Sequence, residues 1–193
     1  MFDAPNSFSG AVLAGGESRR MGSDKALLTV NGEALWQRQS RVLHSAGANP
    51  VTVVRRREQP PLPGATACVF DQFENAGPLA GLEAALEAAC SDLVAVLAVD
   101  MPAIEAGWFS FLLRHCSRGQ GAVARSPHGL EPLAAIYPRG ALFWARGQIE
   151  AERFALQEFV RVLENQTLVR VVDLPPAFRK QAENWNEPGR SIL

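Results

Sequence analysis

Residues 9–25 constrain this chain more than any other stretch, and their sequence is SGAVLAGGESRRMGSDK. They open with an apolar run, residues 11–14, which is short enough to form a buried β-strand. The run ends in Gly15 and Gly16, and two arginines, Gly22 and Lys25 follow. Because glycine has no Cβ, backbone N–H groups can come close to phosphate oxygens, and neighbouring cations can neutralise the remaining charge. The stretch therefore predicts a strand that leads into a phosphate-binding loop.

Two familiar glycine loops do not fit this stretch. In a P-loop a lysine directly follows the second glycine of the motif, whereas Ser23 and Asp24 stand here between Gly22 and the lysine. No serine or threonine follows Lys25 to bind Mg²⁺. The dinucleotide fingerprint G-x-G-x-x-G is also absent, because the first two glycines are adjacent. This argues against a nucleotide-dependent oxidoreductase.

Apolar runs and helical periodicities alternate along the rest of the chain, which is typical of an α/β protein. The helix over residues 33–46 is expected to end at Gly47. The segment 141–164 is expected to form one interrupted helix or two short helices around Gly147. Strands are expected at residues 11–14, 50–54, 67–70, 93–99, 121–124 and 168–172, with another after the segment E-P-L at 131–133. We therefore predict one doubly wound, mostly parallel sheet with helices on both faces, and allow for one antiparallel strand.

Composition narrows the classes of partner. With 193 residues, one domain spanning 1–193 is the expected organisation. A formal net charge of -1 gives no electrostatic footprint for nucleic acid or an acidic membrane, so neither is expected as a partner. No apolar run approaches the ~20 residues of a membrane span, and the N-terminus lacks a signal-peptide pattern, so a cytoplasmic protein is expected. The three cysteines lack metal-ligand spacing and are expected to be buried thiols.

Asp100 is the strongest candidate for a metal ligand. It follows residues 93–99, the most apolar run of the chain, which predicts a central strand buried on both faces. A carboxylate at the carboxyl end of such a strand projects into the binding crevice of an α/β sheet, and Mg²⁺ is usually held by one or two carboxylates plus substrate phosphates. The alternative is that Asp100 caps the turn that Met101 and Pro102 favour.

A cluster of three arginines, residues 55–57, follows the predicted strand 50–54. At the carboxyl end of a parallel strand these cations could face a polyanion. The alternative is a solvated loop, which is the more common fate of a charge run.

Four segments in a fixed order resemble the molybdenum cofactor guanylyltransferases of the nucleotidyltransferase superfamily. They are LAGG with RMG and a lysine (residues 13–25), an aspartate with GPLAG (71–81), VDMP (99–102) and EPL (131–133). The resemblance spans residues 10–188 and implies a Rossmann-like nucleotidyltransferase fold. It divides the domain into a nucleotide-binding half, about 9–100, and an acceptor-binding half, about 101–193.

The resemblance also implies the reaction and its residues. GMP would pass from GTP to the phosphate of molybdopterin with release of pyrophosphate, with Mg²⁺ as the cofactor on Asp100. Catalysis is assigned to Arg20, Lys25 and Asp100, with Arg20 preferred over Arg19 because it directly precedes Met-Gly. The residues implied to bind the nucleotide are Leu13, Ala14, Gly15, Gly16, Lys25, Arg56, Asp71, Gly77, Pro78, Asp100, Asn184 and Asn186.

On the acceptor side the resemblance offers Arg125, His128 and Glu131 as residues facing the pterin, although a solvated loop is the alternative for His128. A molybdoenzyme or another cofactor-biosynthesis protein is a further candidate partner.

Two other functions stay open from the sequence. A relative with the same fold could use CTP or a sugar-phosphate acceptor, and competition between GTP and CTP would separate these readings. A non-catalytic cofactor-binding adaptor could also use this fold, because a fold does not by itself guarantee activity.

Overall fold

The structure is a computed structural model that describes residues 7–16 and 24–182. The strands are β1 (Ser9–Leu13), β2 (Thr29–Val30), β3 (Glu33–Ala34), β4 (Val51–Arg55), β5 (Cys68–Phe70), β6 (Leu93–Ala98), β7 (Gly121–Ser126), β8 (Gly129–Leu130), β9 (Ala134–Pro138) and β10 (Val169–Asp173). The helices are α1 (Leu35–Ser45), α2 (Pro78–Ala88), α3 (Ala106–Leu113), α4 (Ala141–Glu150) and α5 (Leu156–Asn165), with the 3-10 helices η1 (Lys25–Leu27) and η2 (Pro176–Ala182).

One sheet in the order β10-β7-β9-β6-β1-β4-β5 forms the centre of the molecule, and β8 pairs with the last two residues of β7. Strands β5, β4, β1 and β6 run parallel to one another, and β10 runs parallel to β7. Strand β9 is antiparallel to both of its neighbours, β6 and β7. The predicted mostly parallel α/β sheet is confirmed. Strand β9 is the antiparallel strand for which the prediction allowed.

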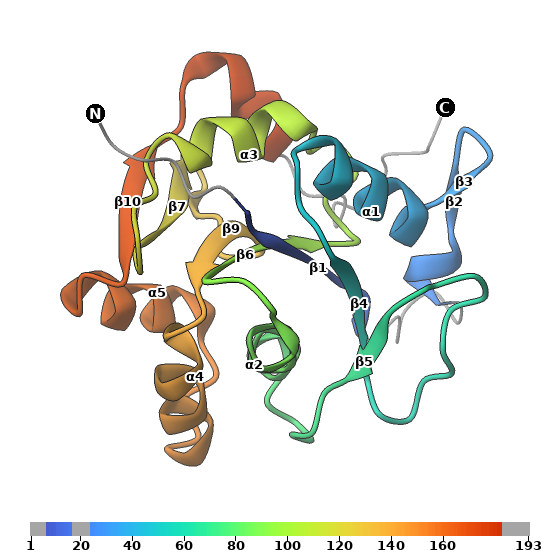
Figure 1. The fold of residues 1–193 in the computed structure, drawn as a ribbon, viewed down its shortest axis with the longest axis horizontal. Helices are drawn as coiled ribbons and strands as arrows, with labels where there is room; N and C mark the ends of the chain where they lie inside the picture. Colours follow the sequence, from blue (N-terminus) through green and yellow to red (C-terminus); the bar gives the residue numbers. More distant parts are fainter. Residues whose placement is uncertain (1–6, 17–23, 183–193) are drawn as a thin grey trace.

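Helices cover both faces of this sheet (Figure 1). Helices α1 and α3 pack on one face around Trp108 and Leu43, and α2, α4 and α5 pack on the other around Leu82 and Phe159. Because β6 lies between these two layers, all six of its residues are buried, as its continuous apolar sequence requires. The indole of Trp108 fixes α3 to β9 by donating a hydrogen bond of 2.7 Å to the carbonyl of Ala134.

The end of α1 agrees with the prediction from sequence, whereas the end of α4 does not. Helix α1 ends as predicted at Gly47, which has a φ of +99° that glycine adopts without strain. Two short helices form in 141–165, as one of the predicted alternatives, but the break between them lies at residues 151–155, so its predicted position around Gly147 was wrong. Helix α4 ends in a Schellman motif whose left-handed residue is Glu152 (φ +54°), with Arg153 N–H donating to the carbonyl of Gln148 at 2.8 Å.

Two smaller expectations are also corrected. The strand expected at 121–124 is longer, because β7 continues to Ser126 and forms a hairpin with β8. Of the three cysteines, Cys116 is buried and Cys68 is half-buried, but Cys90 is exposed because it follows the end of α2. Burial raises the pKa of the Cys116 thiol to about 12, which keeps it protonated and unreactive at neutral pH.

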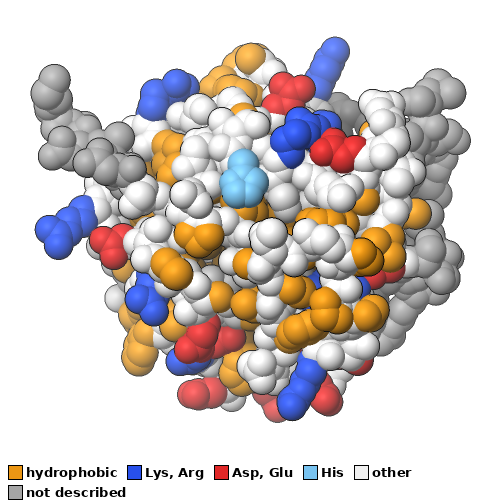
Figure 2. Space-filling view, turned by 45° about the vertical axis from the view of Figure 1, so that its right-hand side comes forward, with side chains coloured by type: hydrophobic (Ala, Val, Ile, Leu, Met, Phe, Trp, Pro, Cys, Tyr) orange, Lys and Arg blue, Asp and Glu red, His pale blue; other side chains and the backbone are white. Residues whose placement is uncertain are grey.

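The surface mixes charges of both signs. On the face shown in Figure 2, Lys and Arg side chains are interspersed with Asp and Glu, and the hydrophobic side chains occur in small groups between polar atoms. In residues 7–16 and 24–182 no helix combines the length and the apolar character needed to cross a membrane.

Candidate active site

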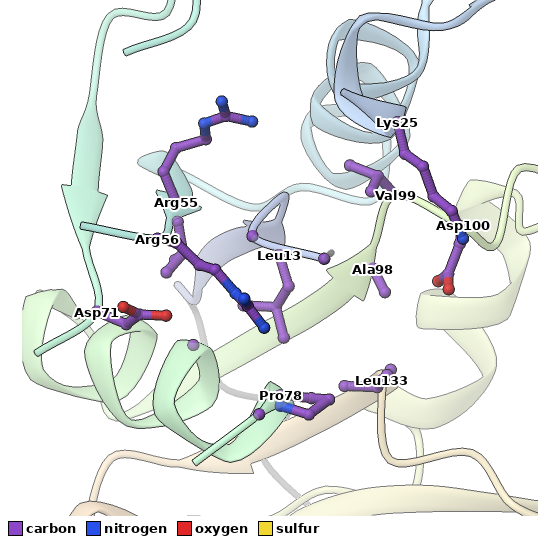
Figure 3. Close-up of a pocket in the computed structure, with 15 residues that line it drawn as sticks. Leu13, Lys25, Arg55, Arg56, Asp71, Pro78, Ala98, Val99, Asp100 and Leu133 are labelled. Atoms are coloured by element: carbon purple, nitrogen blue, oxygen red, sulfur yellow. The ribbon is translucent and has the colours of Figure 1, made fainter. Parts of the chain in front are cut away.

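A cavity of about 240 Å³ lies at the carboxyl ends of β1, β4, β5 and β6 (Figure 3). Because these four strands are adjacent and parallel, the residues that follow them meet at one edge of the sheet. The N-terminus of α2 and Leu133, just before β9, close the opposite side. The lining residues are Leu13, Gly15, Gly16, Lys25, Val54, Arg55, Arg56, Asp71, Gly77, Pro78, Gly81, Ala98, Val99, Asp100 and Leu133.

Most of the residues expected to bind a nucleotide line this cavity. They are Leu13, Gly15, Gly16, Lys25, Arg56, Asp71, Gly77, Pro78 and Asp100. Ala14 is buried beneath it, and its N–H and carbonyl are hydrogen-bonded to Val54 and Arg55. The predicted residues Arg20, Asn184 and Asn186 lie outside the described residues. The structure thus brings residues from distant segments of the sequence to one cavity. The roles assigned to these residues stay predictions.

The glycines after β1 allow the chain to pass close to the end of β4. A Cβ built on Gly15 would lie 3.2 Å from the backbone nitrogen of Arg56 and 3.1 Å from its Cγ, so a larger residue would press on Arg56. Gly16 has no heavy atom within 4 Å of such a Cβ and is exposed. Gly15 therefore serves packing, and Gly16 leaves its backbone accessible to a ligand.

The three arginines of the cluster differ in burial, because Arg55 ends β4 and the other two follow the strand. Arg55, the last residue of the strand, is completely buried. Arg56 is half-buried and lines the cavity, whereas Arg57 is exposed. In Figure 3 the side chains of Arg55 and Arg56 extend in different directions. Of the two explanations for the cluster, a ligand-facing cation therefore fits Arg56 alone, and a solvated residue fits Arg57.

Lys25 begins the short helix η1, which holds it at the cavity. The preceding residue, Asp24, caps η1 by accepting a hydrogen bond of 3.0 Å from the backbone N–H of Ala26. In Figure 3 the Lys25 side chain extends toward Asp100 along one side of the cavity. A cation from η1 and a carboxylate from the turn after β6 thus meet at one end of the site.

The segment that carries Asp100 is held by two side chains of α1. The amide nitrogen Nε2 of the fully buried Gln39 donates to the carbonyls of Ala98 (3.1 Å) and Met101 (2.8 Å), one on each side of Asp100. Arg38 Nε donates to the carbonyl of Pro102 at 2.8 Å. These contacts fix the backbone of the segment and leave the half-buried Asp100 carboxylate directed into the cavity.

Asp71 and the start of α2 form the other end of the cavity. Burial raises the pKa of the Asp71 carboxyl, although hydrogen bonding by the Arg57 backbone and the charge of Arg56 oppose this shift. Gly77 precedes the helix with a φ of +59°, a conformation in which any other residue would be strained, and Pro78 occupies the first turn. A second cavity of about 270 Å³ shares Arg56, Asp71 and Gly77 with the first. The site therefore extends from the first cavity, with its apolar side chains such as Leu13 and Val54, into a neighbouring cavity.

The three acceptor-side candidates do not converge in the same way. Glu131 is buried and accepts a hydrogen bond of 2.6 Å from Ser126 Oγ, and burial raises its pKa. Arg125 forms an exposed ion pair of 3.7 Å with Asp173. His128 is exposed, in agreement with the solvated alternative. None of these three residues lines the cavity described above.

Six residues line the cavity that the sequence analysis did not assign to the nucleotide: Val54, Arg55, Gly81, Ala98, Val99 and Leu133. Four of these are the last residues of β4 and β6 or the residue after β6, so strand ends were the available signal. Leu133 could not be found in this way, because it reaches the cavity through the antiparallel pairing in which Ala98 N–H donates to its carbonyl at 2.9 Å.

Comparison with solved structures agrees with this architecture. A nucleotidyl transferase from Methanothermobacter thermautotroptrophicus superposes with a TM-score of 0.74 at 17% identity, covering 94% of this chain and 92% of that one. A molybdopterin-guanine dinucleotide biosynthesis protein A from Archaeoglobus fulgidus superposes with a TM-score of 0.68 at 22% identity, covering 93% of each chain. The fold is therefore that of the nucleotidyltransferases.

Sequence comparison is more specific. The model of the MobA-like NTP transferase domain matches residues 10–169. A protein of Opitutus terrae named "Probable molybdenum cofactor guanylyltransferase" is 54% identical over 95% of this chain and 92% of its own length. The molybdenum cofactor guanylyltransferase of Syntrophotalea carbinolica is 31% identical over 80% of this chain and 74% of its own. The chain belongs to the MobA-like NTP transferase family.

Proposed function

We propose that this protein transfers GMP from GTP to molybdopterin and releases pyrophosphate. The observation that carries the proposal is the convergence of Gly15, Gly16, Lys25, Arg56, Asp71 and Asp100 on one cavity, in a chain whose relative at 54% identity bears the name of this activity. A cavity with an apolar floor and cationic side chains suits a nucleoside attached to a polyphosphate.

The chemistry needs alignment of two anions more than it needs a base. A terminal phosphate oxygen of molybdopterin forms a bond to the α-phosphorus of GTP, and the bond from that phosphorus to the bridging oxygen of the β-phosphate breaks. The electron pair leaves with pyrophosphate, and no proton has to be removed from the nucleophile. The residues of the site would therefore act by position and charge.

The residues divide this work by their position in the cavity. The glycine backbone and Lys25 would bind the β- and γ-phosphates, with Arg20 as a further predicted cation outside the described residues. Asp71 lies at the end of the cavity away from Asp100, and it would contact the nucleoside together with Gly77 and Pro78 of the same lining. Arg56 lies between these two ends, where it would interact with phosphate or ribose oxygens.

Asp100 suits a Mg²⁺ ion that is shared with the substrate. Magnesium in nucleotide sites is commonly held by one or two carboxylates, with phosphate oxygens and water as the other ligands. In the part of the chain that the structure describes, no group of three or more His, Cys, Asp or Glu side chains could hold a metal by itself. Mg²⁺ bound there would neutralise charge on the phosphate oxygens during transfer.

The proposal is tested by transfer from GTP labelled at the α-phosphate. With Mg²⁺ and molybdopterin, we expect label in a molybdopterin dinucleotide and an equal amount of pyrophosphate. Unlabelled GTP should compete more strongly than CTP. Transfer from CTP in preference to GTP would contradict the choice of guanine, and nucleotide binding without transfer would support the adaptor alternative. A cytoplasmic location and a molybdoenzyme partner stay predictions.

A further inference from the structure

The buried residue Arg55 connects both ends of the glycine and lysine segment. Its Nη1 donates to the carbonyl of Ala14 at 3.1 Å, and Ala14 immediately precedes Gly15. Its Nη1 and Nη2 also donate to the two carboxylate oxygens of Asp24, at 3.2 and 2.6 Å, and Asp24 immediately precedes Lys25. One guanidinium therefore contacts the residue before the glycines and the residue before the lysine.

The remaining contacts of Arg55 and Asp24 fix the pair in place. Arg55 Nε donates to the carbonyl of Pro60 at 3.2 Å, and Asp24 Oδ1 also accepts from the N–H of Ala26 at 3.0 Å. The side chain of Arg55 is fully buried, whereas that of Asp24 is 22% exposed. The guanidinium is thus held by four oxygen atoms, and the carboxylate couples it to the first turn of η1.

Stability alone is a weak reason to place an ion pair here. Removing two charges from water is costly, and apolar side chains of similar volume often stabilise a protein as well as a buried ion pair does. An arginine does what an apolar residue cannot, because its planar fork holds two separate segments in one geometry. Both segments carry groups that the proposed function assigns to the triphosphate.

We propose that Arg55 and Asp24 are positioning residues that set the separation between the Gly15–Gly16 backbone and Lys25, and thereby determine affinity for the triphosphate moiety. This inference rests on the proposed function for the identity of the ligand. It assigns no contact with the nucleoside, because the guanidinium extends away from Arg56 and is enclosed by protein.

Two conservative variants test the pair. Arg55→Lys keeps the positive charge but cannot contact Asp24 and Ala14 through a fork, and Asp24→Asn keeps an oxygen that can cap η1 while removing the charge. Binding is measured by calorimetry for inorganic tripolyphosphate with Mg²⁺, for GTP with Mg²⁺ and for GMP. We expect each variant to weaken tripolyphosphate and GTP binding by about tenfold or more, because a displaced Lys25 would lose charge-assisted hydrogen bonds to the phosphates. GMP binding should change little.

A double-mutant cycle tests whether the pair acts through Lys25. In a Lys25→Ala background, Asp24→Asn should reduce tripolyphosphate affinity by much less than it does in the wild type, because residues in one network are not additive. Arg41→Lys is the matched control, since Arg41 forms a similar two-contact pair with Glu33 (3.0 and 2.7 Å) but is exposed on α1. It should leave all three affinities unchanged.

Several results would overturn the inference. Unchanged tripolyphosphate binding in Asp24→Asn would do so even if Arg55→Lys failed to fold, as would equal losses for GTP and GMP or full additivity with Lys25→Ala. Failure of the proposed function has a different signature. Wild-type protein that binds tripolyphosphate through Lys25 but does not transfer GMP would contradict the activity and still support the positioning role.

Discussion

Charged residues behave differently at two parts of the sheet. At the carboxyl ends of β4, β5 and β6, the side chains of Arg56, Asp71 and Asp100 line a shared cavity. Around the β7–β8 hairpin, Glu131 is hydrogen-bonded to Ser126 inside the protein and Arg125 pairs with Asp173 on the surface. The first group faces the cavity, whereas Glu131 is enclosed within the protein and Arg125 is paired at its surface.

Strand direction accounts for the difference. Strands β5, β4, β1 and β6 are parallel, so the residues that follow them lie at one edge of the sheet although they are far apart in the sequence. Strand β9 runs in the opposite direction between β6 and β7, so only the residue before it, Leu133, reaches that edge. Substitutions in the parallel part should therefore alter nucleotide chemistry, and those in the antiparallel part should alter stability.

The largest expected effect is on the antiparallel part. A Cβ at Gly121 would lie 2.0 Å from the carbonyl oxygen of Ile136, so Gly121→Ala must force β7 and β9 apart. We expect a loss of about 3 kcal/mol or more in the free energy of unfolding, the upper end for overpacking, measured by urea denaturation. Gly147→Ala is the control, because no heavy atom lies within 4 Å of its Cβ and alanine favours the helix. Equal stability of the two variants would contradict this packing.

The next effect is on catalysis at the parallel part. Lys25→Ala or Asp100→Ala should each reduce GMP transfer by at least ~100-fold, as is usual when a key charge-stabilising group is lost. Melting temperatures should change little, because both side chains lie at the cavity rather than in the core. Initial rates with saturating GTP and Mg²⁺ measure this effect. Near-normal rates in both variants would contradict the site assignment.

The parallel part was also the more predictable from sequence. Glycines after β1, the aspartates after β5 and β6, and Gly77-Pro78 before α2 all lie at strand or helix ends, where backbone geometry demands particular residues. The fold class followed from the alternation of strands and helices. The different fates of the three arginines were missed because the end of β4 at Arg55 and the contacts that bury its guanidinium depend on the tertiary structure.

Helix ends show the same limit of local signals. The stop at Gly47 was predictable because glycine tolerates a positive φ. Helices α4 and α5 are followed by Glu152 (φ +54°) and Thr167 (φ +58°) in the same left-handed position, residues that give no such signal. Gly147, in contrast, lies within α4 with open space around it and does not end the helix.

A smaller effect is expected from Gln39, which supports Asp100 from α1. Gln39→Leu removes the donor to the buried carbonyls of Ala98 and Met101, which should cost about 1–3 kcal/mol of unfolding free energy. Transfer should also slow, because the segment carrying Asp100 is less firmly held. Gln37→Leu, at an exposed position of the same helix, is the comparison variant, and it removes only the longer hydrogen bond of 3.4 Å that Gln37 Oε1 accepts from the N–H of Ala34. Urea denaturation and initial rates are measured for both variants. Equal unfolding free energies and equal rates would contradict a supporting role of Gln39 for Asp100.

The smallest effect concerns pH and Glu131. Since burial raises the pKa of this carboxyl above its usual 4.5, the folded state favours the protonated form. Its contribution to stability is therefore full below pH 4.5 and is lost as pH rises through the raised pKa. Glu131→Gln lacks this titration, so its free energy of unfolding relative to the wild type should rise over the same range. A constant difference between pH 4 and 8 would contradict the shift.

The central claim is that the cavity at the parallel strand ends binds a guanine nucleotide through Lys25 and Asp100. Thermal unfolding with GTP, CTP, ATP and UTP, each with and without Mg²⁺, tests it most directly, in the wild type beside Lys25→Ala. Ligand at ~100 times Kd should add about 2.7 kcal/mol of stability. We predict a Mg²⁺-linked shift that is largest for GTP and lost in Lys25→Ala. A shift that is equal for all four nucleotides, or that persists in the variant, would contradict the account.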